Sequence, residues 1–190
     1  LENRVKFFRG DEDDVLQRIS DLIVAHEVDV HVECFGDSPL TDHRIVDEFV
    51  GYLLKNYETL DFVSNSLATT YPPGAEVIAY KGEVLTSANN LTAHDDPLRE
   101  HVSLHIYQRN DLYRVENLIA PKHLHFPELY MEVDTQEDFR VMSFIIENLV
   151  ENSQEFCELE YLIDLLLSNP DVALLNTKVE RRWKEFRNGN

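Results

Sequence analysis

Two aspartates, far apart in the sequence, carry the clearest sign of chemistry. Asp37 lies in the segment CFGDSPL and Asp134 in YMEVDTQED, and each follows a run of residues typical of a strand. Open α/β sheets place their ligands at the carboxyl ends of strands, so the two carboxylates are expected to lie close together. Carboxylate oxygens are ligands that Mg²⁺ prefers. The alternative is structural, with Asp37 as a turn residue and Asp134 as a helix cap.

A second group of candidates is the run Arg99-Glu100-His101. A guanidinium binds a phosphate or a carboxylate in bidentate fashion, so Arg99 could hold an anionic substrate, with Glu100 beside it. His101 could accept a proton near neutral pH. The structural alternative is a helix surface on which Arg99 and Glu100 form an ion pair of little energy.

The acidic run 11–14 predicts the start of a helix. Asp11 is expected to be the N-cap, and Asp14 three positions later resembles its partner in a capping box. Arg9 and Arg18 flank this run. They could face a ligand, or they could tether the acidic residues, and both interpretations stay open.

The composition narrows the class of partners. The chain of 190 residues carries a formal net charge of −19, which argues against nucleic-acid binding. A phosphate-bearing substrate would therefore need a divalent cation and nearby Arg or Lys residues. The sequence contains no long apolar run and no signal peptide, and Cys34 and Cys157 are isolated. These features predict a cytoplasmic protein without a membrane partner.

The pattern of apolar residues predicts an α/β fold in which strands and helices alternate. This order implies a mainly parallel sheet joined by right-handed crossovers. Strands are expected at 5–9, 28–35, 61–65, 113–120 and 129–134, with another after the Pro-Pro-Gly turn; helices are expected from 11, from 41 or 42, within 81–93, after Pro97, at 136–150 and at 155–168.

The order of these segments resembles a known family. FFRGDEDDVLQRI, CFGDSPLTDHRIVDEF, DFVSN, TYPPGAEV, DDPLREHV and MEVDTQEDFRVM follow one another as in the cytidylyltransferases of the spore-coat-polysaccharide (SpsF) type. That family is similar to the synthetases that make CMP-activated acidic sugars. The resemblance covers about residues 4–150, so 1–150 is expected to form the α/β domain and 151–190 a C-terminal helix and charged tail.

The resemblance implies a Rossmann-like nucleotidyltransferase fold with helices on both faces of the sheet. A sugar hydroxyl would attack the α-phosphate of CTP and release pyrophosphate, with Mg²⁺ bound by Asp37 and Asp134 as in related synthetases. The family commonly reads G-x-D-x-E after a Tyr-Pro turn, where this chain has Gly74 and Glu76 followed by an apolar residue. That departure leaves the acceptor sugar open.

The resemblance also implies a homodimer, formed by a lobe at 66–105 in which Tyr71, Tyr80, Leu91 and Leu98 are expected to be exposed. A second departure concerns the family's first strand and its QARMGSTRLPGK-like loop, which the sequence lacks. The N-terminal unit is therefore expected to be missing, and with it tight nucleotide binding. Two alternatives remain: an inactive binding or assembly module of the same fold, and a metal-dependent glycosyltransferase.

Overall fold

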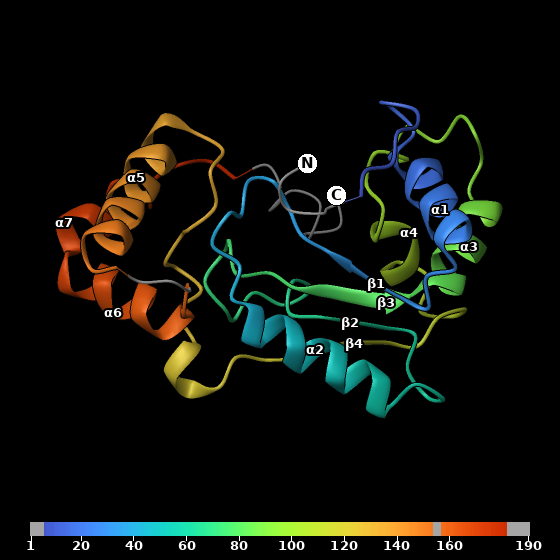
Figure 1. The fold of residues 1–190 in the computed structure, drawn as a ribbon, viewed down its shortest axis with the longest axis horizontal. Coiled ribbons are helices and arrows are strands. Elements are labelled where there is room, and N and C mark those ends of the chain that lie inside the picture. Colours follow the sequence, from blue (N-terminus) through green and yellow to red (C-terminus); the bar gives the residue numbers. More distant parts are fainter. Residues whose placement is uncertain (1–5, 154–156, 182–190) are drawn as a thin grey trace. The chain divides into compact units, whose positions relative to one another are not determined.

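The computed structural model describes residues 6–153 and 157–181 as a mixed α/β protein (Figure 1). Strands and helices are interspersed up to residue 117, and only helices follow among the described residues. The elements are α1 (Val15–His26), β1 (Val30–Glu33), α2 (His43–Lys55), β2 (Phe62–Ser64), β3 (Ile78–Lys81), α3 (Gly82–Leu91), α4 (Leu104–Tyr107), β4 (Val115–Asn117), the 3₁₀ helix η1 (Lys122–Leu124), α5 (Gln136–Glu151), α6 (Leu159–Ser168) and α7 (Pro170–Ala173).

The four strands form one sheet in the order β1-β3-β2-β4. Strands β2 and β4 are parallel, because the N–H of Asp61 donates to the carbonyl of Arg114 at 2.9 Å and that of Leu118 donates to Ser64 at 2.8 Å. The sequence predicted this direction, and the predicted α/β class is confirmed.

Strand β3 runs against its two neighbours. Its start lies beside the end of β2, where the N–H of Asn65 donates to the carbonyl of Val77 at 3.3 Å. Its end lies beside the start of β1, where the N–H of Gly82 donates to Asp29 at 2.9 Å. Strands β1, β2 and β4 therefore share one direction and β3 opposes it, so the sheet is mixed: the pair β2–β4 is parallel, and β3 pairs antiparallel with both of its neighbours.

The chain divides into two compact units. One comprises Leu1–Val32, Tyr52–Val63 and Ala79–Glu116, and the other comprises Glu33–Gly51, Ser64–Ile78 and Asn117–Asn190. The described part of 151–190 thus belongs to the second unit. Within the described residues, no helix is long and apolar enough to cross a membrane.

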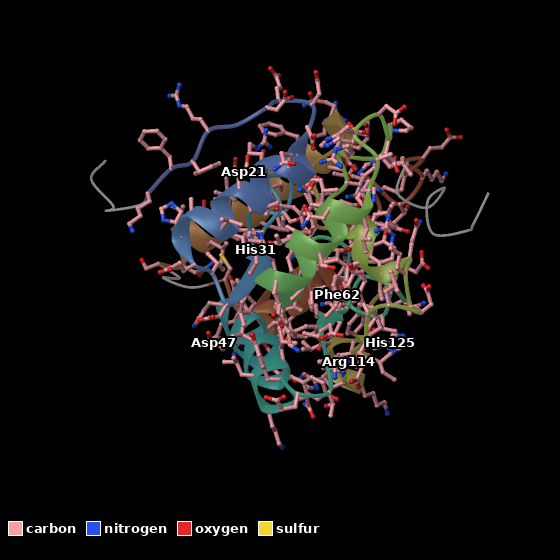
Figure 2. All side chains as sticks on the ribbon, turned by 90° about the vertical axis from the view of Figure 1, so that its right-hand side faces the viewer. Asp21, His31, Asp47, Phe62, Arg114 and His125 are labelled. Carbon is pink, nitrogen blue, oxygen red and sulfur yellow. The ribbon has the colours of Figure 1, made fainter. Side chains whose placement is uncertain are left out.

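The first unit is built around α1, α3 and α4. Helix α1 packs on α3, and α3 packs on α4. The rings of Phe62 and Tyr80 stack with their centroids 6.1 Å apart, and both side chains are fully buried (Figure 2 labels Phe62). Gly82 begins α3 against the end of α1, where a Cβ would lie 2.8 Å from the Ile23 side chain and closer still to the carbonyl of Val28. Only glycine fits this contact between backbones.

Helix α1 begins three residues later than the sequence suggested. Asp14 is its N-cap and accepts the N–H of Gln17 at 2.9 Å. Asp11 instead accepts the N–H groups of Asp13 and Asp14, at 2.9 and 3.1 Å, in a turn that precedes the helix. The prediction that Asp11 caps the helix was wrong, because the same acidic run offers two local hydrogen-bonding arrangements.

Three other predicted elements differ from the structure. Residues 6–9 are not a strand, and Val5 lies outside the described residues. The helix expected after Pro97 is a series of turns followed by the short α4. Residues 129–134 are irregular rather than a strand. Their backbone is nevertheless fixed, because Met131 donates to the carbonyl of Pro73 at 2.7 Å.

The second unit contains η1, α5, α6 and α7, of which α7 has no counterpart among the predicted helices. Helix α6 contacts η1 and α7. Its own N-cap residue, Glu158, makes no side-chain capping bond. The buried carboxylate of Asp42 takes that role from the start of α2, accepting the N–H of Leu159 at 2.9 Å and that of Arg44 at 2.9 Å.

Candidate functional site

The two candidate metal ligands, Asp37 and Asp134, lie on neighbouring segments of the second unit. The N–H of Val133 donates to the carbonyl of Asp37 at 2.9 Å, which places Asp134 one residue from that bond. The Asp37 side chain is exposed and accepts a hydrogen bond from the hydroxyl of Ser38 at 3.3 Å. The side chain of Asp134 is 44% exposed. Both carboxylates therefore reach solvent from adjoining stretches of backbone.

This pair suits a cation that takes its other ligands from water and from the phosphates of a substrate. The described residues contain no group of three or more His, Cys, Asp or Glu side chains that could hold a metal ion. Mg²⁺ in nucleotide sites is commonly bound by one or two carboxylates, with phosphate oxygens and water as the remaining ligands. Two exposed aspartates fit this requirement. The identity of a bound metal stays a prediction.

The Tyr-Pro turn packs directly against the segment that carries Asp134. Gly74 is buried with φ at +99°, and a Cβ there would lie 2.6 Å from the backbone nitrogen of Glu132. The carboxylate of Glu76 accepts the N–H of Gly74 at 2.6 Å. In the structure these two residues close the turn that packs against the segment of Asp134, and their predicted binding of substrate stays a prediction.

The buried side-chain amide of Asn65 forms two hydrogen bonds with the backbone of the same turn. Asn65, 2% exposed, donates to the carbonyl of Ala75 at 3.0 Å and accepts the N–H of Val77 at 2.8 Å. Its side chain thus replaces a strand pairing at the point where β2 ends. These two hydrogen bonds fix the conformation of the turn.

A charged cluster that sequence reasoning missed surrounds the start of α5. The carboxylate of Asp138 accepts hydrogen bonds from Nη1 and Nη2 of Arg181, at 3.0 and 2.6 Å, and from Nδ2 of Asn176 at 2.8 Å. It also completes a capping box with Thr135. Burial acts to raise the pKa of Asp138, but the hydrogen bonds from Arg181, Thr135 and Asn176 outweigh it, so the pKa is lowered. Asp138 is thus an anion in the folded protein at neutral pH.

The remaining predicted residues lie in the first unit. Arg99 is 3% exposed, and its guanidinium donates to Asp14 at 2.9 Å, to Asn89 at 2.5 Å and to the carbonyl of Thr92 at 3.2 Å. Burial acts to raise the pKa of Asp14, but the bonds from Arg99 and from the N–H of Gln17 outweigh it and lower the pKa. In this structure Arg99 supports α1 and α3; its predicted role toward a substrate is not tested.

The neighbours of Arg99 line a shallow pocket of the first unit. Nε2 of His101 lies 3.4 Å from Oε1 of Glu100, and both residues line a pocket of about 450 Å³ together with Glu12 and Asp13. With three carboxylates, this pocket would repel a phosphate rather than bind one. A role of His101 in proton transfer stays a prediction.

Of the two arginines that flank the first helix, Arg18 is the better fixed. Its Nη1 donates to the carbonyl of Asp11 at 2.6 Å, and its methylenes pack against Gly10. Arg18 therefore tethers the acidic run, one of the two roles that the sequence left open. Arg9 is exposed, and its guanidinium lies 5.5 Å from the centre of the Phe7 ring.

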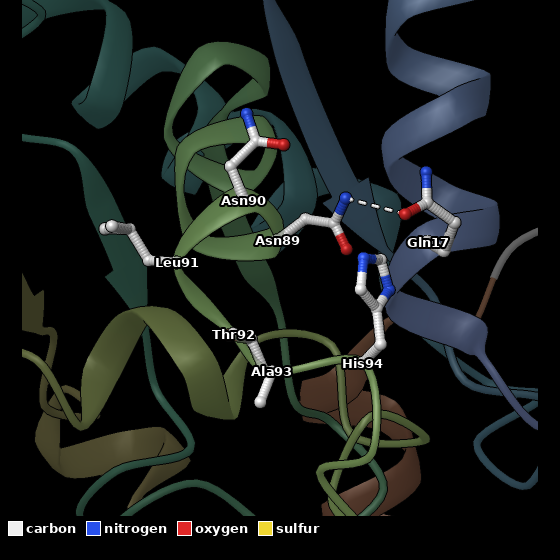
Figure 3. A pocket seen from close by; sticks show the side chains of 7 residues that line it. All are labelled: Gln17, Asn89, Asn90, Leu91, Thr92, Ala93 and His94. Carbon is white, nitrogen blue, oxygen red and sulfur yellow. Dashed lines mark hydrogen bonds between the residues drawn. The ribbon is translucent and has the colours of Figure 1, made fainter.

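A second pocket of the first unit, of about 400 Å³, is lined by amide side chains (Figure 3). Gln17 and Asn89 face each other across it and share a hydrogen bond of 3.0 Å, and the His94 ring lies beside them. Because Asn89 also accepts from Arg99, this lining is tied to the network of α1 and α3.

A buried ion pair of the first unit also escaped sequence reasoning. Asp61 is 7% exposed and accepts from Lys81 at 3.0 Å and from Arg114 at 2.6 and 2.8 Å (Figure 2 labels Arg114). The hydrogen bonds from Arg114, assisted by Lys81, hold the pKa of Asp61 far below its ordinary value despite burial. The partners are 20 and 53 residues from Asp61, so no local pattern marks them.

The fold has a counterpart among known structures. The structure of a cytidylyltransferase from Leptospira borgpetersenii serovar Hardjo-bovis superimposes with a TM-score of 0.80 over 95% of this chain and 73% of that one, at 23% identity. The fold is therefore that of a cytidylyltransferase.

The sequence gives the same result independently. The Cytidylyltransferase family matches residues 2–180, and the chain belongs to this family of enzymes. It is 28% identical over 173 residues to the spore coat polysaccharide biosynthesis protein SpsF of Bacillus subtilis, covering 91% of this chain and 69% of that protein. It is 31% identical over 187 residues to an uncharacterised protein of Methanocaldococcus jannaschii, covering 96% and 71%. The resemblance seen in the sequence is confirmed.

Proposed function

We propose that this chain transfers CMP from CTP to a hydroxyl of a cell-surface sugar and releases pyrophosphate, with Mg²⁺ bound at Asp37 and Asp134. The observation that supports this best is the backbone hydrogen bond between Val133 and Asp37, which brings together the two segments that carry the exposed aspartates in a chain of the cytidylyltransferase family. The similarity to a spore coat polysaccharide protein favours a sugar as the acceptor.

In this reaction the protein mainly has to position the reacting groups and stabilise the charge on the phosphates. The sugar hydroxyl forms a bond to the α-phosphorus as the bond to the β-phosphate oxygen breaks, and the hydroxyl proton is released. Bound Mg²⁺ supplies positive charge to the phosphate oxygens. Asp37 and Asp134 fix where that charge lies. In a chain of net charge −19, a triphosphate without a divalent ion would be repelled.

The test is calorimetric titration of CTP with and without Mg²⁺. Wild-type protein should bind CTP only with the metal present, and Asp37→Asn and Asp134→Asn should each weaken that binding about tenfold or more, because each removes a charged ligand. Asp47→Asn is the matched control, since Asp47 is an exposed aspartate on α2 (Figure 2) and should leave binding unchanged. Tight binding without metal that survives both substitutions would refute the proposal.

A product assay separates this activity from that of a glycosyltransferase. A cytidylyltransferase releases pyrophosphate from CTP in proportion to the sugar consumed. Release of free CMP or CDP from a nucleotide sugar would instead favour the alternative. The assay therefore needs CTP and a candidate sugar, with pyrophosphate measured directly.

The homodimer belongs to the same proposal. Of the four residues expected to be exposed in the lobe at 66–105, Leu91 is 57% exposed, whereas Tyr71 and Tyr80 are 4% and 0% exposed. The two tyrosines were wrongly expected at the surface; both pack in the core, Tyr71 against Phe49. Sedimentation at micromolar concentration tests the dimer, and a strict monomer would refute it.

A further inference from the structure

We infer that Arg181 and Asp138 are positioning residues that hold the carboxylate of Asp134 ready for a metal ion. This inference rests on the proposed function, because it concerns the same aspartate. No relationship in the sequence suggests it: Arg181 follows α7 in a stretch expected to be a charged tail, 47 positions after Asp134.

The first step is the backbone that carries Asp134. Oδ2 of Asp138 accepts the N–H of Asp134 at 3.2 Å, and the N–H and hydroxyl of Thr135 at 2.9 and 2.8 Å. On the other side, Val133 is bonded to the carbonyl of Asp37. The peptide units before and after Asp134 are therefore both held. Displacement of the Asp138 carboxylate would release both of them and leave only the bond of Val133, one peptide unit earlier.

The second step is the guanidinium that holds Asp138. The side chains of Arg181 and Asp138 are both 0% exposed, and they form a two-pronged pair with distances of 3.0 and 2.6 Å. The ring of Tyr130 lies 4.6 Å from the guanidinium carbon. A planar guanidinium fixes a carboxylate in orientation as well as in position, which an ammonium group does not.

The third step is how the positive charge is shared. Nη1 of Arg181 lies 3.3 Å from Oε1 of Glu132 but 3.9 Å from Oδ2 of Asp134. The longer distance is beyond a hydrogen bond, so Arg181 attracts Asp134 without occupying its oxygen. Asp134 thus remains 44% exposed and available to a cation, while Asp138 accepts the hydrogen bonds of Arg181 and Glu132 forms the closer ion pair.

The cluster is a poor way to gain stability alone. Nε of Arg181 and Oδ1 of Asn176 are buried without a hydrogen-bond partner among the described residues. Buried ion pairs can often be replaced by apolar packing without loss of stability, and unsatisfied buried groups destabilise. Because stability does not account for this network, its place beside a candidate metal ligand favours a role in orienting that carboxylate.

The experiment measures binding of Mn²⁺ alone, by electron paramagnetic resonance of the free ion, with competition by Mg²⁺. Arg181→Lys keeps the charge and loses the planar fork, and Asp138→Asn removes the charge that holds Arg181 away from Asp134. Each should weaken Mn²⁺ binding about tenfold, the effect typical of partners that orient metal ligands. The matched control is Arg114→Lys, which alters a two-pronged pair with Asp61 in the first unit.

The outcomes are distinct. Weaker Mn²⁺ binding in Arg181→Lys but not in Arg114→Lys supports the inference, whatever the two melting temperatures. Unchanged binding in Arg181→Lys, with binding lost in Asp134→Asn, overturns the inference and leaves the proposed function standing. Unchanged binding in Asp134→Asn overturns both. Should Asp138→Asn fail to fold, Arg181→Lys alone decides the question.

Discussion

Substitution of Gly74 by alanine should both destabilise the protein and disturb its metal site. The φ angle of +99° lies in the left-handed region, which an alanine occupies at a cost of about 1–2 kcal/mol. The added Cβ would stand 2.6 Å from the nitrogen of Glu132 and from the carbonyl oxygen of Met131. These are backbone atoms, which cannot move aside alone, so overpacking adds about 1–3 kcal/mol.

The two contributions predict a loss of about 2–5 kcal/mol in the free energy of unfolding. In a protein of this size, each kcal/mol shifts the melting temperature by about 2–4 °C. Gly74→Ala should therefore melt about 5–15 °C lower. Since the clash lies in the segment that leads into Asp134, Mn²⁺ binding should weaken as well.

Calorimetric melting of Gly74→Ala beside Gly51→Ala checks this reasoning. A Cβ at Gly51, on the exposed side of α2, would have no atom within 4 Å, so that variant should be as stable as wild type or slightly more so. An unchanged melting temperature in Gly74→Ala would refute the packing argument. Lost CTP binding at an unchanged melting temperature would show instead that Gly74 touches the substrate directly.

Two further substitutions test the first unit. Asp61→Asn should lower the free energy of unfolding by about 3–5 kcal/mol, because it leaves Lys81 and Arg114 without their buried partner. Since the pKa of Asp61 is lowered on folding, its stabilisation is fully present above about pH 4 and declines as the pH falls toward the folded value. The free energy of unfolding in urea should therefore differ less between pH 7 and pH 3 in the variant than in wild type, and an equal difference would contradict the assignment. Asp14→Ala removes the cap of α1 and the carboxylate that pairs with Arg99. The free energy of unfolding should fall by at least the ~1 kcal/mol of a helix cap, and unchanged helix content and melting temperature would contradict the capping role.

The sequence could predict those features that follow from general rules of α/β folds. Asp37 and Asp134 were expected side by side because strand ends converge at one edge of a sheet, and their segments do lie together. The reason is only partly the expected one, since 129–134 is not a strand. Its backbone is held by single hydrogen bonds to Asp37 and Pro73 instead, and such bonds leave no periodic pattern in the sequence.

The partners of charged residues could not be predicted in the same way. Arg99 looked like a substrate ligand because of its residue type, but it lies buried against Asp14, 85 positions earlier. Arg181 looked like part of a solvated tail, but it lies buried against Asp138. Which of many carboxylates an arginine meets depends on the packing of whole elements, and a chain with 36 acidic residues offers too many choices.

The capping of α6 by Asp42 has a consequence for the order of folding. The bond joins residues 117 positions apart, whereas a helix cap is ordinarily supplied by an adjacent residue and forms with the first turn. A helix of ten residues is marginal in isolation, so α6 should become persistent only after its first turn has met the start of α2. During synthesis, the bond between Leu159 and the carboxylate of Asp42 can therefore form only after Leu159 has left the ribosome. In the folded protein, the amide hydrogen of Leu159 should exchange with solvent as slowly as those in the middle of α6, although amides at the start of a helix normally exchange fast.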